Sequence, residues 1–157
     1  MKASILTLVL VTLMAFFVIK ESAARNVVGV WKVNWERTEP TIRAVPETFT
    51  DRVQTVEDFK RLVAKGAKGL VLEIQPSNTA VMHHPSGSSQ KLTWSEDSKY
   101  DIWVEQRFFM TAGIGHGFTV SGPDTAKLNF QVEWNENVAT RVPLIMERQR
   151  TDSADSK

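Results

Sequence analysis

The chain contains no cysteine among its 157 residues. This absence excludes disulfides, thiol catalysis, cysteine-ligated zinc and a lipid anchor attached through a lipobox cysteine. The chain also lacks an excess of charge, because 19 Lys and Arg residues face 18 Asp and Glu residues and leave a formal net charge of +1. Binding to nucleic acid requires a strongly basic surface, so we expect no nucleic-acid partner.

Histidine is scarce, with three residues in the chain. His83 and His84 are neighbours in a predicted strand, so their side chains point to opposite faces, and His116 lies far along the chain in a glycine-rich stretch. We expect surface or turn histidines and no metal site, because no spacing matches a set of metal ligands. The serines of residues 85–89 occupy a soft turn rather than a strand-to-helix elbow, and no carboxylate pair is apparent. We therefore expect no catalytic residues, no cofactor and no enzymatic activity; His116 close to a serine and a carboxylate would reverse that expectation.

One long apolar run stands at the N-terminus. Residues 3–19 contain no charged side chain, Lys2 precedes them, and Ser22 and Ala24 are small residues at the spacing that signal peptidase requires. We predict a signal peptide over residues 1–24. The alternative is an uncleaved membrane anchor over residues 3–19, since the run just reaches the length of a spanning helix. Either reading places a domain over residues 25–150 outside the cytoplasm, periplasmic or secreted, followed by a short polar tail over 151–157.

The first part of this domain predicts a strand and then a helix. Residues 27–35 alternate, with Gly29, Trp31, Val33 and Trp35 on one face. Residues 37–50 carry two prolines without a clean period and predict a loop. Residues 51–65 place an apolar stripe on one helical face, and Gly66 predicts the end of that helix.

From residue 69 onward, short alternating segments separated by turn residues predict a meander of strands. Residues 111–117 are glycine-rich and predict an irregular loop. The result is a mainly β fold of about eight antiparallel strands, with one helix between the first and second strands. We favour closure into a barrel, which removes exposed strand edges, over an open two-sheet sandwich. The segments predicted as the later strands are 69–75, 79–84, 90–95, 100–110, 118–121, 127–134 and 138–150.

The stretch Gly29-Val30-Trp31 on the first predicted strand resembles the Gly-x-Trp signature of lipocalins and fatty-acid-binding proteins. The resemblance implies that Trp31 plugs the closed end of a barrel and that an arginine of the last strand lies across it. Arg148 fits that role, because it shares the phase of Leu144 and Met146. The helix after the first strand is similar to the lid of the fatty-acid-binding branch. The paired arginine and tyrosine that hold a carboxylate in that branch are not recognised here. The closest likeness is to short bacterial exported lipocalin-like domains.

The aromatic residues lead to two readings of function. In the first, Trp35, Trp94, Phe130 and Trp134 line an apolar pocket at the barrel mouth, and the helix opens or closes it over a small apolar or amphipathic ligand. In the second, the core is solid, and the protein is an envelope or protein-interaction module that works through its outer surface. Trp103 and Phe109, on the opposite phase of their predicted strand, would then form an exposed aromatic patch.

Overall fold

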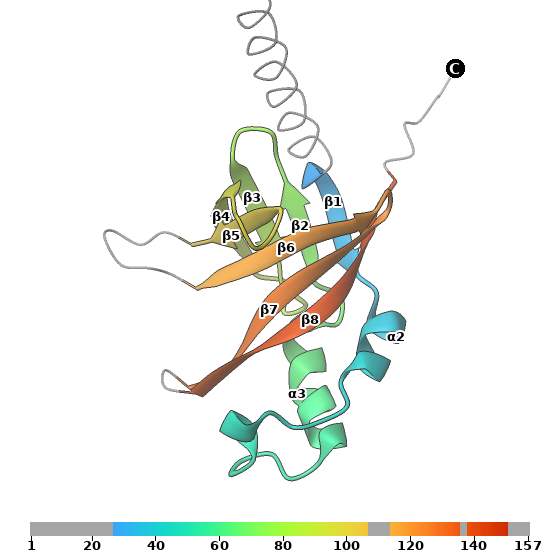
Figure 1. Ribbon diagram of the computed structural model, residues 1–157, viewed down its shortest axis with the longest axis vertical. Coiled ribbons are helices and arrows are strands. Elements are labelled where there is room, and N and C mark those ends of the chain that lie inside the picture. Colours follow the sequence, from blue (N-terminus) through green and yellow to red (C-terminus); the bar gives the residue numbers. More distant parts are fainter. Residues whose placement is uncertain (1–26, 107–113, 136–137, 151–157) are drawn as a thin grey trace, which may run out of the picture.

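The computed structural model describes residues 27–106, 114–135 and 138–150, and of residues 134, 135 and 138 it describes the backbone alone. Within these ranges the chain forms a closed antiparallel barrel in which each strand pairs with its neighbours in sequence and the last pairs with the first (Figure 1). The predicted eight-stranded barrel is confirmed, and the sandwich alternative is wrong. The strands are β1 (Gly29–Val33), β2 (Val71–Ile74), β3 (Thr79–His83), β4 (Ser89–Glu96), β5 (Ile102–Glu105), β6 (Gly115–Gly122), β7 (Thr125–Asn135) and β8 (Val138–Arg148).

The predicted N-terminal signal or anchor over residues 1–24 and the polar tail over 151–157 lie outside the described residues. So do Phe109 and most of the segment that joins β5 to β6. None of the helices in the described ranges is long and apolar enough to cross a membrane.

Alternation along the strands puts one apolar cluster inside the barrel. On β8, for example, Val142, Leu144 and Met146 are buried, while the alternating residues Arg141 and Pro143 are exposed. Neighbouring strands contribute partners in register, such as Leu128 of β7 opposite Leu144. Between its two ends the barrel is therefore filled largely by its own apolar side chains.

The segment between β1 and β2 contains more helix than expected. It begins with a short helix α2 (Trp35–Thr38), continues through two 3₁₀ turns, Glu39–Thr41 and Glu47–Phe49, and ends in helix α3 (Val56–Ala67). The prediction that Trp35 shares the inward phase of the first strand is wrong. The strand ends at Val33, and Asn34 caps α2 by accepting a hydrogen bond from the Arg37 backbone N–H at 3.0 Å.

Helix α3 is the predicted helix, with one correction at its end. Thr55 caps its start by accepting a hydrogen bond from the Asp58 backbone N–H at 3.1 Å. Phe59, Val63 and Ala67 are its buried face. Gly66 lies inside the helix rather than beyond it. The chain leaves the helix at Gly69, whose φ of +92° is the left-handed conformation that favours glycine at this position.

The glycine-rich stretch is not an irregular loop throughout. Gly115, His116 and Gly117 are the first residues of β6; all three pair with β5, and Gly117 also pairs with β7. Glycine weakens a strand unless something approaches its backbone closely, and here two aromatic rings do so. The rings occupy the space that a Cβ would need, so glycine is required at these two positions of the strand.

Candidate functional site

Trp31 and Arg148 meet at one end of the barrel, which we call the plug end. Trp31 is fully buried, donates its Nε1–H to the Val27 carbonyl at 2.8 Å, and packs edge-to-face on Phe118 with ring centres 5.2 Å apart. The guanidinium carbon of Arg148 lies 4.3 Å from the centre of the Trp31 ring. A cation at that distance over an indole face is held by the ring quadrupole.

Gly29 makes room for this arrangement. A Cβ at Gly29 would lie 2.8 Å from Nη1 of Arg148, and the φ of Gly29 is +145°. The same Nη1 donates to the Val28 carbonyl at 2.7 Å, and Nε of Arg148 donates to the Pro123 carbonyl at 3.2 Å. Arg148 therefore links the β6–β7 turn to the start of β1 by hydrogen bonds, and these contacts close the plug end.

Of the four residues predicted to line one pocket, Trp94 and Phe130 are buried in the core cluster, and Trp35 packs half-buried against that cluster. Trp94 is 6% exposed and donates its Nε1–H to the Gln75 carbonyl, in the β2–β3 turn, at 2.9 Å. Phe130 stacks on His116, and a Cβ at Gly66 of α3 would lie 3.6 Å from its ring. Trp35 is the first residue of α2 rather than part of a strand. Trp134 belongs to β7 by its backbone, and its side chain lies outside the described residues.

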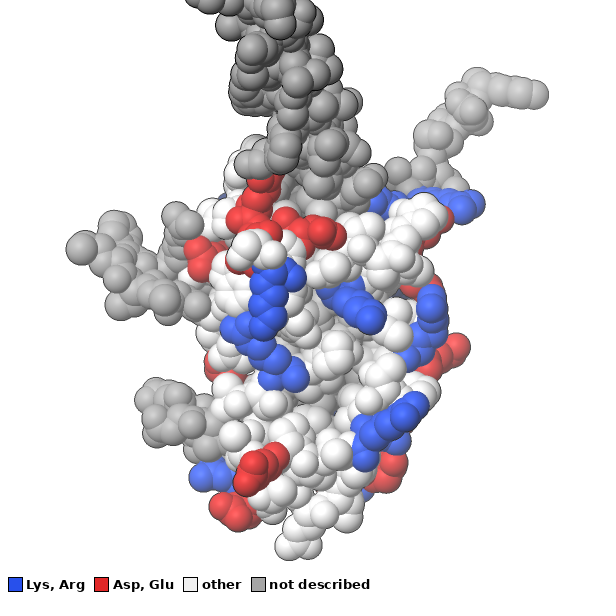
Figure 2. All heavy atoms as spheres, in the orientation of Figure 1, with Lys and Arg blue, Asp and Glu red and all other residues white. Residues whose placement is uncertain are grey.

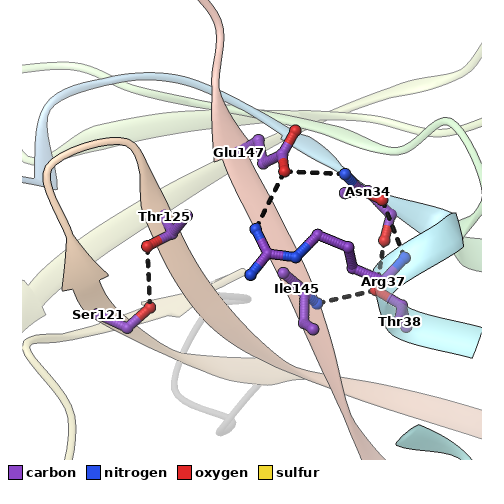
Figure 3. Close-up of polar contacts among 7 residues, drawn as sticks. All are labelled: Asn34, Arg37, Thr38, Ser121, Thr125, Ile145 and Glu147. Carbon is purple, nitrogen blue, oxygen red and sulfur yellow. Dashed lines mark hydrogen bonds and ion pairs between the residues drawn. The ribbon is translucent and has the colours of Figure 1, made fainter. Parts of the chain in front are cut away.

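Trp35 lines an open hollow of about 560 Å³ between β1, α2, the link from α3 to β2, and the end of β8. Polar contacts fix α2 beside it (Figure 3). Glu147 of β8 accepts hydrogen bonds from Asn34 Nδ2 at 2.8 Å and Arg37 Nη1 at 3.2 Å. Thr38, buried, accepts the Ile145 backbone N–H at 2.9 Å. This network attaches α2 firmly to β8.

The end of the barrel opposite the plug, which we call the helix end, carries a group of inward polar side chains. His84 Nε2 donates to Gln90 Oε1 at 3.3 Å, and Gln90 Nε2 donates in turn to Gln106 Oε1. His116 lies on β6 and is 5% exposed, one of two buried polar residues in the described part of the chain. These four residues form what we call the polar layer.

His116 is held in one orientation. Its ring stacks on Phe130 with centres 5.3 Å apart and planes 11° apart, and its Nδ1 accepts the Gln131 backbone N–H at 3.3 Å. Nδ1 therefore carries no proton in this bond, and Nε2 carries the proton of the neutral ring. Burial, with the nearby charges of Arg141 and His84, lowers the pKa of His116 to about 4. The ring is neutral near pH 7.

This lowered pKa predicts a loss of stability in acid. The unfolded chain takes up the His116 proton below about pH 6.5, while the folded chain resists until pH falls to about 4. The contribution of neutral His116 to the free energy of unfolding is therefore fully present above pH 6.5. It declines by up to about 3 kcal/mol as the pH falls from 6.5 to about 4. Urea unfolding at the two ends of the window measures it. His116→Phe keeps the stacked ring and removes the proton, so its decline should be smaller. An equal decline in both proteins would contradict the assignment.

The polar layer was missed by sequence reasoning, although part of its signal is present. His84 continues the phase of the inward residues Ala80 and Met82, and Gln90 continues that of Leu92 and Trp94. A polar residue on an otherwise apolar phase indicates an inward polar group. The prediction of a surface or turn position for His116 is wrong, because His116 lies within β6, is 5% exposed and stacks on Phe130.

Within the described ranges, His116 forms no hydrogen bond with a serine or a carboxylate, and no group of three or more potential ligands could hold a metal ion. On the outer face, His83 contacts both kinds of group: its Nδ1 lies 2.8 Å from Ser89 Oγ and its Nε2 lies 3.9 Å from Glu73 Oε2, and all three side chains are accessible to solvent. In comparisons with protein-family models, curated proteins and solved structures, this chain matched none of them.

Proposed function

We propose that this chain is an exported, lipocalin-like protein that holds a small apolar or amphipathic molecule at the helix end of its barrel and does not transform it. The observation that carries the proposal is the polar layer. An apolar barrel that places hydrogen-bonding groups inward at one end has the composition of a ligand site, where a few polar groups orient a mostly apolar molecule.

Helix α3 is the cover in this proposal, because it is attached differently from α2. The side-chain hydrogen bonds and ion pairs described for α3 lie within the helix and its cap: Thr55 with Asp58, Lys60 with Glu57, and Arg61 with Asp58. Its attachment to the barrel is the burial of Phe59, Val63 and Ala67. Burial is non-directional, so α3 can shift over an entering ligand at less cost than α2, which would break its bonds to β8.

The polar layer also favours one kind of head group. His116 is neutral near pH 7, and the two glutamines are neutral at every pH. Arg148 lies across the barrel at the plug end. A hydroxyl, amide or other uncharged hydrogen-bonding head suits these partners, with the apolar part of the ligand against Phe130 under α3.

The adjacent histidines offer a matched test. His84 belongs to the polar layer, whereas His83 points outward and bonds Ser89 on the neighbouring strand at 2.8 Å. The full-length chain is titrated by calorimetry with a long-chain alcohol, a monoacylglycerol, a sterol and a fatty acid. We expect saturable binding of an uncharged amphipath that is about tenfold weaker in His84→Ala, as the loss of one buried hydrogen bond implies, and unchanged in His83→Ala.

Circular dichroism on every variant separates loss of binding from loss of fold. If a folded protein gives no saturable signal with any of these compounds, or if His83→Ala and His84→Ala weaken binding equally, the ligand site at the helix end is wrong.

A further inference from the structure

A second feature lies on the outer face of the barrel, away from the polar layer. Trp103 points outward from β5, between buried Ile102 and Val104. A Cβ added at Gly115 of β6 would collide with the Trp103 indole, and one at Gly117 would lie 2.6 Å from the Tyr100 ring. The two rings therefore rest directly on the backbone of β6. Their centres are 5.8 Å apart and their planes differ by 31°. We call this pair the aromatic floor.

Two cations accompany the aromatic floor. The guanidinium carbon of Arg141 lies 4.7 Å from the centre of the Trp103 ring, and Nζ of Lys99 lies 5.6 Å from that of Tyr100. In the part of the chain that the structure describes, neither side chain is in an ion pair. An arginine stacked on an indole keeps the donors at its edge available, and these donors match the two oxygens of a carboxylate.

These groups border a hollow of about 360 Å³. Asp97 at its rim is engaged locally, because its Oδ1 accepts the backbone N–H groups of Lys99 and Tyr100 at 2.8 and 3.0 Å. Figure 2 shows the face over β6, β7 and β8, where Lys and Arg side chains run down the middle and a group of acidic side chains lies above them. The hollow is lined by Ser95, Asp97, Ser98, Lys99, Tyr100, Trp103 and Arg141.

We propose that this hollow binds a carboxylate carried on a ring. The C–H groups or the edge of the ring pack against Tyr100, because an aromatic face is electron-rich and attracts C–H groups and ring edges. The carboxylate receives two hydrogen bonds from Arg141, with Lys99 as a second cation. The volume fits one or two ring-sized units. A uronic acid of a saccharide and an aromatic acid share this chemistry, and the experiment distinguishes them.

The test uses the full-length chain and four probes: trigalacturonate, 2-naphthoate, and their uncharged counterparts galactotriose and 2-naphthalenemethanol. Binding is followed by calorimetry and by the NMR signal of the Trp103 indole N–H. We expect at least one acid to bind saturably, to shift that signal and to bind more weakly at high salt. Its uncharged counterpart should bind at least tenfold more weakly, which corresponds to about 1.4 kcal/mol.

Charge-removing variants keep the aromatic floor intact. Arg141→Gln and Lys99→Gln should each weaken binding of the acid, whereas Lys32→Gln, an exposed lysine on β1, should leave it unchanged. Binding of trigalacturonate alone identifies a saccharide site, and binding of naphthoate alone identifies an aromatic-acid site. The proposal is overturned if neither acid binds, if the uncharged probes shift the Trp103 indole N–H signal at the same concentrations as the acids, or if Arg141→Gln binds like the unmodified chain. The Trp103 signal separates this site from the helix end, where an uncharged compound such as 2-naphthalenemethanol would bind without shifting it.

Discussion

Replacing Trp31 with alanine should lower the free energy of unfolding by about 3–5 kcal/mol, the range for truncating a buried large aromatic side chain. Trp31 is fully buried, donates to the Val27 carbonyl, packs on Phe118 and supports the Arg148 guanidinium. All four contributions are lost together, and a void remains at the plug end. Since domains of this size are stable by about 5–15 kcal/mol, the loss is a large fraction of the total. Urea unfolding monitored by far-ultraviolet circular dichroism measures it.

Trp35→Ala is the matched control for this change. Trp35 lies only four positions along the chain but is half-buried, at the edge of an outer hollow. Its side chain packs on the edge of the core and borders the outer hollow, so its truncation enlarges that hollow rather than leaving an enclosed void, and we expect a loss near 1 kcal/mol. Equal losses in the two variants would show that Trp31 does not plug the barrel.

Gly115→Val should be the next most destabilising change, by about 1–3 kcal/mol, because it forces a side chain into occupied space. The Cβ of any residue at this position meets the Trp103 indole. The ring must lift from β6, which separates it from Tyr100 and disturbs the stacked Arg141 guanidinium. Thermal unfolding measures the loss of stability, and the fluorescence maximum of the chain should shift to longer wavelength as the indole meets water.

Two further variants give this prediction its controls. A Cβ at Gly66 of α3 would make only an ordinary contact with Phe130, so Gly66→Ala should stabilise the protein by about 0.5–1 kcal/mol through helix propensity. In a Trp103→Ala background the obstacle is removed, so Gly115→Val should cost much less. If Gly115→Val costs the same in both backgrounds, the collision with the ring is not the cause.

The sequence was sufficient to predict the barrel because strand alternation and short turns are local signals. Trp31, Leu144, Met146 and Arg148 could be placed inward from their phase alone, and the structure puts them there. Helix α3 was likewise recognised from its apolar stripe. These features depend on residues that are close in sequence, so they can be recognised without knowing how the strands and the helix pack together.

The remaining features depend on contacts between distant segments. Trp35 continues the alternation of β1, yet Asn34 caps a helix that is fixed to Glu147, 113 residues away. Gly115 and Gly117 indicate a loop until Trp103 and Tyr100 are seen to cover them. The polar layer combines residues that directly follow β3 and β5 with residues of β4 and β6, and the pairing of these strands, rather than any one strand, brings them to the same end of the barrel.

The seam between β1 and β8 has a consequence for the order of folding. Only three residue pairs join the two strands, from Trp31 with Arg148 to Val33 with Met146, and the hydrogen bond from Arg148 to Val28 spans 120 residues. The other pairings of the barrel join strands that are consecutive in the chain. Bringing β1 and β8 together closes a long loop, and the chain loses this conformational entropy before the contacts between the two strands stabilise it. We therefore expect the hairpins to form first and the pairing of β1 with β8 to form last. Trp31 and Arg148, which are far apart in sequence, therefore come together in the last step of folding. Until they do, β1 and β8 are unpaired edge strands to which another chain could pair.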